Sequence, residues 1–246
     1  MSGPEILTGG AIGIFVKLPS IEVVEIAALA GLDFVVVDLE HSPLSIETAA
    51  TLVAIARARG LGALVRIPDH SATWVQRCLD AGADGLMVPH VDSIGQARAL
   101  HASSHFPPHG TRGCGPTTRA GGWGLRPQSD YLTAEPLLLG QVESQAGVDA
   151  AEAVVAERLV SSLFLGPADL ALSLGVEAPS SELEASIDHV RETGAAAGVP
   201  TGIAAPSGEA ARRRIDQGFD YVVVSNDTTL LGTALRDVVA GARPQR

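Results

Sequence analysis

The chain has little of several residue types, and each shortage removes a class of protein. Its two cysteines, Cys78 and Cys114, are too few for a disulfide framework or a cysteine zinc site. The formal net charge is −11, and the arginines form no run beyond residues 212–214, which argues against nucleic acid and anionic membranes as partners. No apolar run is long enough to span a bilayer, and no secretory signal opens the chain. We therefore expect a cytoplasmic protein.

Aromatic residues are also scarce, at 4% of the chain, whereas 46% of the 246 residues are hydrophobic. Small aliphatic residues and glycine suit the packing of helices on a sheet better than a sandwich with aromatic corners. A single domain of this length is common among α/β barrels. We therefore expect one domain over residues 1–246.

Short apolar runs rich in β-branched residues alternate with longer segments of helical period, a pattern that predicts parallel strands joined by helices. The alternation occurs eight times and predicts a (β/α)8 TIM barrel. A small residue followed by glycine ends several helices, as in "ALAGLD", "LDAGAD", "AAAGVP" and "IDQGFD". The expected strands are residues 11–17, 33–39, 62–67, 85–89, 137–143, 162–166, 199–204 and 221–225.

One connection, residues 103–131, is too long and too rich in glycine and proline for a simple linker. Loops of this length in compact domains are usually functional or disordered. It contains Arg112, Arg119, Trp123 and Arg126, so we predict a functional loop.

Reactive side chains gather where several expected strands end. In a (β/α)8 barrel the active site lies at the C-terminal ends of the strands, so these side chains predict a site there. They are Asp38, Glu40 and His41 after the second strand, Arg66 in the third, Gln141 and Glu143 in the fifth, and Asp169 after the sixth.

Glu143 and Asp169 offer two carboxylates on neighbouring strands. Oxygen ligands without cysteine suit a hard divalent ion that keeps several waters, such as Mg²⁺, Mn²⁺ or Co²⁺. Capping of a helix by Asp169, or a surface salt bridge, is the competing account. The pair together favours a metal site.

His41 and Arg66 are the candidate catalytic groups. A histidine titrates near neutrality, and a carboxylate such as Asp80, at the end of the third helix, would orient the ring. A guanidinium is always charged and stabilises a developing oxyanion or enolate. The competing accounts are a hydrogen-bonding loop histidine and an ion pair of Arg66 with Asp38 or Glu40.

The motifs "VVVDLEHSP", "VRIPD", "CLDAGADGLMVPHVDS", "FPPHGTRGCG", "GQVES" and "LFLGPADLALSLG" together resemble the HpcH/HpaI family of class II pyruvate aldolases. The resemblance covers nearly the whole chain. It implies a metal-dependent barrel, a homotrimer or homohexamer with the last helix exchanged between subunits, that cleaves or forms 4-hydroxy-2-oxo acids from pyruvate and a small aldehyde through a pyruvate enolate.

Residue by residue, the resemblance implies a set of roles. They are metal ligands Glu143 and Asp169; an enolate-stabilising Arg66; His41 paired with Asp80 in acid/base work; pyruvate contacts from Gln141, Gly166, Pro167 and Ala168; and supporting positions for Asp38 and Glu40.

His90 and residues 117–131 depart from the family pattern, and we expect them to line the aldehyde side. Three alternatives stay open. They are a Schiff base on Lys17, the chain's one lysine; a CoA-thioester lyase of the citramalyl-CoA or malyl-CoA type; and a non-catalytic barrel that binds an oxo acid.

Overall fold

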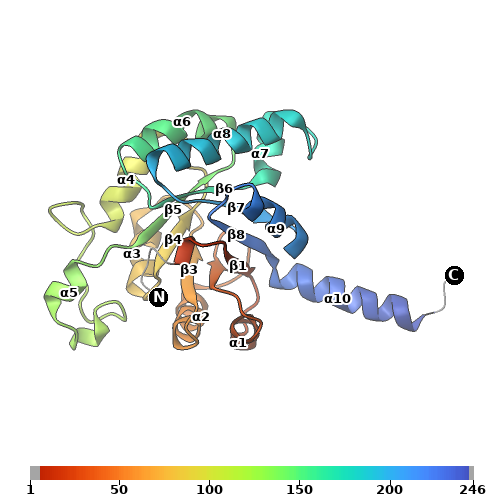
Figure 1. The fold of residues 1–246 in the computed structure, drawn as a ribbon. Helices are drawn as coiled ribbons and strands as arrows, with labels where there is room; N and C mark the ends of the chain where they lie inside the picture. The colour runs from red at the N-terminus through yellow and green to blue at the C-terminus, as the bar shows by residue number, and fades with distance from the viewer. Residues whose placement is uncertain (1–5, 244–246) are drawn as a thin grey trace.

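The structure is a computed structural model that describes residues 6–243. Eight parallel strands form a closed barrel in the order of the sequence (Figure 1). Each strand lies within two residues of its expected bounds, so the predicted (β/α)8 barrel is confirmed. The strands are β1 (Ala11–Val16), β2 (Phe34–Asp38), β3 (Gly62–Arg66), β4 (Gly85–Val88), β5 (Leu137–Val142), β6 (Ser162–Leu165), β7 (Thr201–Ala205) and β8 (Tyr221–Asn226).

Helices surround the barrel, except that the last one, α10, projects away from it (Figure 1). Within residues 6–243, none of these helices combines the length and the apolar character that crossing a bilayer requires. The helices are α1 (Ile21–Leu29), α2 (Ile46–Ala58), α3 (Ala72–Asp80), α4 (Ile94–Ser104), η2 (Gly122–Gly124), α5 (Gln128–Leu132), α6 (Gln145–Ala156), α7 (Pro167–Leu174), α8 (Ser181–Ala197), α9 (Gly208–Asp216) and α10 (Asp227–Ala242).

Local sequence signals set the ends of these helices. Helix α2 begins after Ser45, whose Oγ accepts a hydrogen bond from the Thr48 amide at 3.3 Å. The glycines of the four repeated helix-end motifs all have φ between +66° and +97°, as a left-handed helix end requires. The chain therefore turns from helix to strand where the sequence predicts.

Side chains alternate between the inside and the outside of the barrel, as strand geometry dictates. In β2, Phe34 and Val36 lie in the cluster inside the barrel, whereas Val35 and Val37 pack toward the helices. Phe34 packs edge-on against Tyr221, with ring centroids 5.9 Å apart, and Phe164 stacks on Tyr221 at 6.1 Å. These rings fill much of the interior of the barrel below the C-terminal strand ends.

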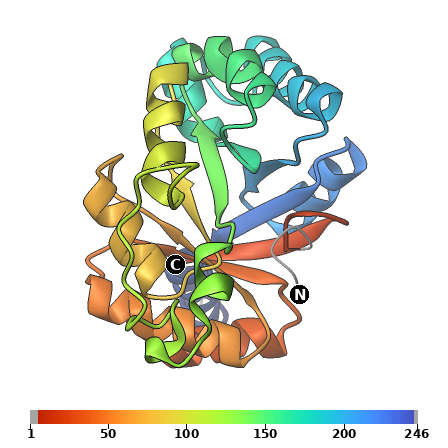
Figure 2. The same cartoon turned by 90° about the vertical axis from the view of Figure 1, so that its left-hand side faces the viewer.

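The long connection, residues 105–136, lies at the opposite, N-terminal end of the barrel. It links the end of α4 to the start of β5, and both of these points lie at the N-terminal end. In Figure 2 this segment crosses the front of the barrel, with α10 behind it. Within one chain, residues 117–131 therefore lie away from the C-terminal strand ends, and the expectation that they line the aldehyde side is wrong for a single subunit.

Candidate active site

Side chains alternate between the two faces of each strand, and this alternation brings polar residues of distant segments together at the C-terminal end of the barrel. Asp38 follows Phe34 and Val36 at the inward-facing spacing of two residues, and Arg66 follows Leu64 in the same way. Arg66 lines a cavity of about 430 Å³, which we call the mouth, and Asp38 lies beneath it as the partner of Arg66. The lining of the mouth includes Lys17, His41, Arg66, Gln141, Gly166, Pro167, Ala168 and Asp169.

Asp38 is the centre of the polar network at the mouth. Its fully buried carboxylate accepts hydrogen bonds from Arg66 Nε at 2.9 Å and Arg66 Nη2 at 2.6 Å, and Lys17 Nζ lies 3.4 Å away. Burial alone raises the pKa of Asp38, but the hydrogen bond and charge of Arg66, the His41 amide and the charge of Lys17 together hold it below its ordinary value. Asp38 is therefore ionised and fixes the Arg66 guanidinium.

Arg66 has further partners. Its Nη1 lies 3.3 Å from Glu40 Oε2, and its guanidinium lies over the Phe15 ring at 4.5 Å. The ion pairs with Asp38 and Glu40, expected as an alternative to a catalytic role, both form. They hold a buried guanidinium in place while it lines the mouth.

Glu143 follows β5 and is almost fully buried. Its Oε1 accepts a hydrogen bond from the His90 amide at 2.8 Å, and its Oε2 accepts one from Gln141 Nε2. Burial raises the pKa of Glu143 above that of an ordinary carboxyl group, and the His90 amide and ring offset this only in part. His90, expected near the aldehyde side, therefore lies beside Glu143, with Nδ1 3.3 Å from Oε1.

Asp169 lies in the first turn of α7, whose N-cap is Gly166. Asp169 is thus not the N-cap, which removes one of the two competing accounts of this residue. It is exposed and lines the mouth. A Cβ on Gly166 would lie 3.2 Å from Glu143 Oε2, so this glycine keeps the space beside that carboxylate open.

The oxygen atoms available as ligands at the mouth fit a divalent cation that keeps several of its waters. Among the described residues, the buried Gln141 Oε1 lacks a hydrogen-bond partner, and the buried Glu40 Oε2 accepts no hydrogen bond although it forms an ion pair with Arg66. In the described part of the chain no three His, Cys, Asp or Glu side chains form a complete metal cage. Mg²⁺ is typically bound by one or two carboxylates, with water or substrate as its remaining ligands. Glu143 and Asp169 could supply such a pair.

The structure separates His41 from Asp80 within one chain. His41 is exposed at the mouth, and its Nε2 lies 3.7 Å from Glu40 Oε2. Asp80 ends α3, at the N-terminal end of the barrel, and its Oδ1 accepts a hydrogen bond from Arg112 Nη2 at 2.8 Å. A helix that follows a parallel strand runs back along it, so its last residue lies at the opposite end from the mouth. The expected His41–Asp80 pair therefore does not form within one subunit.

Asp227 is a buried carboxylate beside the mouth that the sequence analysis missed. It is the first residue of α10, is nearly buried, and accepts hydrogen bonds from the Lys17 amide at 3.0 Å and the Leu18 amide at 2.9 Å. It therefore ties the end of β1, and with it Lys17, to the start of α10. An aspartate directly after the strand "YVVVSN" was the available signal.

The fold and the mouth define a (β/α)8 barrel enzyme whose charged site lies at the C-terminal strand ends. The HpcH/HpaI aldolase/citrate lyase family model matches residues 11–234. A hydroxypyruvate/pyruvate aldolase of Chromohalobacter salexigens is 38% identical over 88% of this chain and 87% of its own. A 5-keto-4-deoxy-D-glucarate aldolase of Klebsiella pneumoniae is 34% identical over 85% and 83%.

Among solved structures, an HpcH/HpaI aldolase/citrate lyase family protein of Burkholderia cenocepacia is 33% identical, with a TM-score of 0.91 over 98% of both chains. The chain belongs to the HpcH/HpaI aldolase/citrate lyase family. It is a carbon–carbon lyase, since aldolases at 34–38% identity match most of its length.

Proposed function

We propose that this protein is a class II pyruvate aldolase, which cleaves or forms 4-hydroxy-2-oxo acids with pyruvate and a small aldehyde as the two parts. The observation that carries the proposal is the placing of Asp169 and Arg66 around one cavity, with Glu143 beside them. The names of the relatives, hydroxypyruvate/pyruvate aldolase and 5-keto-4-deoxy-D-glucarate aldolase, support it. The CoA-thioester lyase alternative fits these relatives less well.

Glu143 and Asp169 would hold the divalent cation, Mg²⁺, Mn²⁺ or Co²⁺. When bound, the cation supplies Lewis acidity toward the carboxylate and keto oxygens of a 2-oxo acid. Burial raises the pKa of Glu143, and a cation held beside this carboxylate would favour its ionised form. Gln141 and the backbone of Gly166, Pro167 and Ala168, which line the same cavity, would contact the pyruvate moiety.

The chain's own groups would carry out the proton and charge transfers. In the cleavage direction the C4 hydroxyl loses its proton, the C3–C4 bond breaks, and the electron pair of that bond passes into the enolate of pyruvate. His41, exposed at the mouth, would take the hydroxyl proton. Arg66, fixed by Asp38, would stabilise the negative charge. Protonation at C3 then gives pyruvate.

The test is deuterium exchange at C3 of pyruvate in D₂O, followed by proton NMR, because it needs no choice of aldehyde. The protein is stripped with EDTA and then resupplied with Mg²⁺, Mn²⁺ or Co²⁺. Exchange that disappears on stripping and returns with the metal supports the proposal. Exchange that survives stripping and is blocked by borohydride in the presence of pyruvate would instead indicate a Schiff base on Lys17, which also lines the mouth.

We also propose that α10 packs against a second copy of this chain, in a homotrimer or homohexamer. Helix α10 projects from the barrel (Figure 1), and its large apolar side chains Leu230, Leu231, Leu235, Val238 and Val239 are exposed. A monomer rarely exposes such a contiguous apolar surface. Sedimentation of Leu235→Glu tests the proposal: smaller particles than for the unchanged chain are expected, and an unchanged particle size contradicts it.

A further inference from the structure

A second cavity, of about 440 Å³, lies at the N-terminal end of the barrel, away from the mouth. Its size is within the range of small-molecule sites. The end of α2, the turn between α3 and β4, and the segment 105–136 form its wall. The chain has 17 Lys and Arg residues and a net charge of −11, yet four arginines line this one cavity. They are Arg57, Arg112, Arg119 and Arg126.

Only part of this positive charge is matched by carboxylates. Arg57 Nη1 lies 2.7 Å from Asp84 Oδ1, and Arg112 pairs with Asp80. Glu135 also lines the cavity, and its Oε2 lies 2.9 Å from His105 Nε2.

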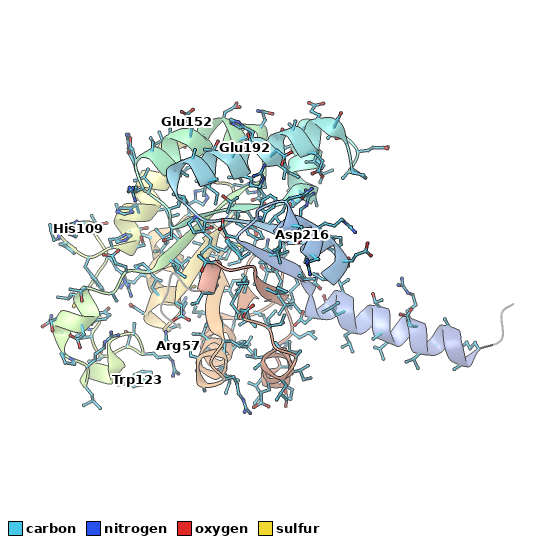
Figure 3. The ribbon with its side chains drawn as sticks, in the orientation of Figure 1. Arg57, His109, Trp123, Glu152, Glu192 and Asp216 are labelled. Carbon is cyan, nitrogen blue, oxygen red and sulfur yellow. The ribbon has the colours of Figure 1, made fainter. Side chains whose placement is uncertain are left out.

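Arg119 and Arg126 form no ion pair within residues 6–243. Arg119 lies over the Trp123 ring at 5.4 Å, and Arg126 Nη1 donates to the Ala120 carbonyl at 3.4 Å. Trp123 lies on this segment, on the side of the molecule away from α10 (Figure 3). The guanidinium groups of Arg119 and Arg126 are therefore available to pair with a negatively charged ligand.

Arg112 is held rigidly at the wall of the cavity. It is 7% exposed, and its guanidinium lies over the rings of Phe106 at 4.7 Å and Tyr131 at 5.9 Å. Its Nε is buried without a hydrogen-bond partner in the described part of the chain. A buried donor without an acceptor is unfavourable, so the guanidinium that lines the cavity has hydrogen-bonding capacity that the described residues do not use.

Backbone geometry makes room for the two unpaired arginines. Gly82 has φ +93°, and a Cβ there would lie 2.8 Å from Arg119 Cδ; Gly122 has φ +61°, and a Cβ there would lie 2.9 Å from Arg126 Cβ. Trp123 has φ +60°, which is unusual for a bulky residue. Such strained backbone concentrates at binding and active sites.

We propose that this cavity binds a small multivalent oxyanion, a phosphate ester or polycarboxylate metabolite, through Arg112, Arg119 and Arg126. The planar donor fork of a guanidinium matches phosphate and carboxylate oxygens in pairs. The site is separate from the mouth and does not rest on the proposed function.

Isothermal titration calorimetry of the full chain, stripped of metal, with inorganic phosphate and with citrate tests the proposal. The variant is Arg119→Gln/Arg126→Gln, and its matched control is Arg212→Gln/Arg213→Gln, which removes the same charge from exposed ion pairs on α9. We expect the first variant to weaken binding by about tenfold or more and the control to leave it unchanged. Tighter binding of phosphate than of citrate would assign a phosphate ester, and the reverse a polycarboxylate.

Lys17→Met distinguishes binding in this cavity from binding at the mouth, because Lys17 lines the mouth alone of the two. An anion could also bind at the mouth. Binding that persists in Lys17→Met and weakens in Arg119→Gln/Arg126→Gln supports the proposal. Binding lost only in Lys17→Met would place the anion at the mouth and overturn it. So would the absence of binding for both anions at millimolar concentration.

Discussion

The two ends of the barrel carry opposite excesses of charge. At the mouth, four carboxylates accompany two cations, whereas four arginines accompany three carboxylates around the N-terminal cavity. An acidic excess suits a divalent cation, and a basic excess suits an anion. Asp169 lines the mouth, and Asp38, Glu40 and Glu143 contact side chains that line it. At the N-terminal end, Asp84 and Glu135 line the cavity and Asp80 pairs with Arg112.

The two ends also differ in what holds their side chains. Asp38 and Arg66 are the last residues of strands, whereas Arg119 and Arg126 lie on the segment between α4 and β5. Residues on strands are fixed by the hydrogen-bond ladder and by the alternation of side chains, while this loop needs left-handed backbone at Gly122 and Trp123. Substitutions at the mouth should therefore act more strongly than those at the other end.

The largest effect is expected for Glu143→Gln. Loss of a carboxylate ligand should lower metal-dependent exchange of pyruvate C3 by about a thousandfold, since Lewis acid stabilisation is worth several kcal/mol. Proton NMR in D₂O measures the rate. Glu157→Gln, at an exposed carboxylate that pairs with Arg98, is the matched control and should exchange normally. A Glu143→Gln protein with near-normal exchange would remove Glu143 from the metal site.

The next effect is expected for Asp38→Asn, which leaves the buried Arg66 and the partly buried Lys17 without their shared carboxylate. Breaking a buried pair in this way costs about 3–5 kcal/mol. Asp216→Asn breaks an exposed pair with Arg212 and should cost less than about 0.5 kcal/mol. Urea unfolding compares them, and equal midpoints would contradict the difference drawn between buried and exposed pairs.

The same carboxylate predicts a dependence of stability on pH. The pKa of Asp38 is lower in the folded state than its ordinary value. Its contribution to stability is therefore complete above the unfolded pKa and is lost as the pH falls through the folded pKa. Unfolding free energies measured from neutral to acid pH should fall less steeply in Asp38→Asn than in the unchanged chain. Parallel curves of unfolding free energy against pH would show that Asp38 does not cause the loss of stability at acid pH.

Much of the mouth could be predicted from sequence because strands impose a period of two. The strand bounds, and the placing of Asp38, Arg66 and Gln141 at one end, follow from that period and from barrel topology. Within one subunit, Asp80 does not lie near His41, because a helix that follows a parallel strand ends at the opposite end of the barrel. The segment 117–131 was misplaced, since neither period nor propensity fixes where a loop of this length lies.

A smaller effect, on catalysis alone, is expected for His41→Ala. Removal of a general base typically costs about a hundredfold or more. We expect cleavage of the 4-hydroxy-2-oxo acid that the unchanged protein accepts to fall by this factor, because only cleavage needs the C4 hydroxyl deprotonated. Exchange at C3 of pyruvate should fall less. His109→Ala, at an exposed histidine labelled in Figure 3, is the control. Full cleavage activity in His41→Ala would exclude His41 as the base.

The smallest effect is expected at the N-terminal end, for Gly82→Ala compared with Gly31→Ala. The two glycines have similar φ, +93° and +87°, so each alanine should cost about 1–2 kcal/mol of stability from backbone strain. Their surroundings differ: a Cβ on Gly31 has no neighbour within 4 Å, whereas one on Gly82 would lie 2.8 Å from Arg119 Cδ. Gly82→Ala must therefore displace Arg119.

The displacement should weaken phosphate binding by about threefold or more in Gly82→Ala, and Gly31→Ala should bind as the unchanged chain does. Calorimetry with inorganic phosphate measures both variants, and urea unfolding confirms that their losses of stability match. Equal phosphate affinities at equal stability would mean that Arg119 does not contact the anion. A loss confined to Gly82→Ala would instead show that a single absent Cβ positions Arg119, whereas strand β3 and the Asp38 carboxylate together position Arg66 at the mouth.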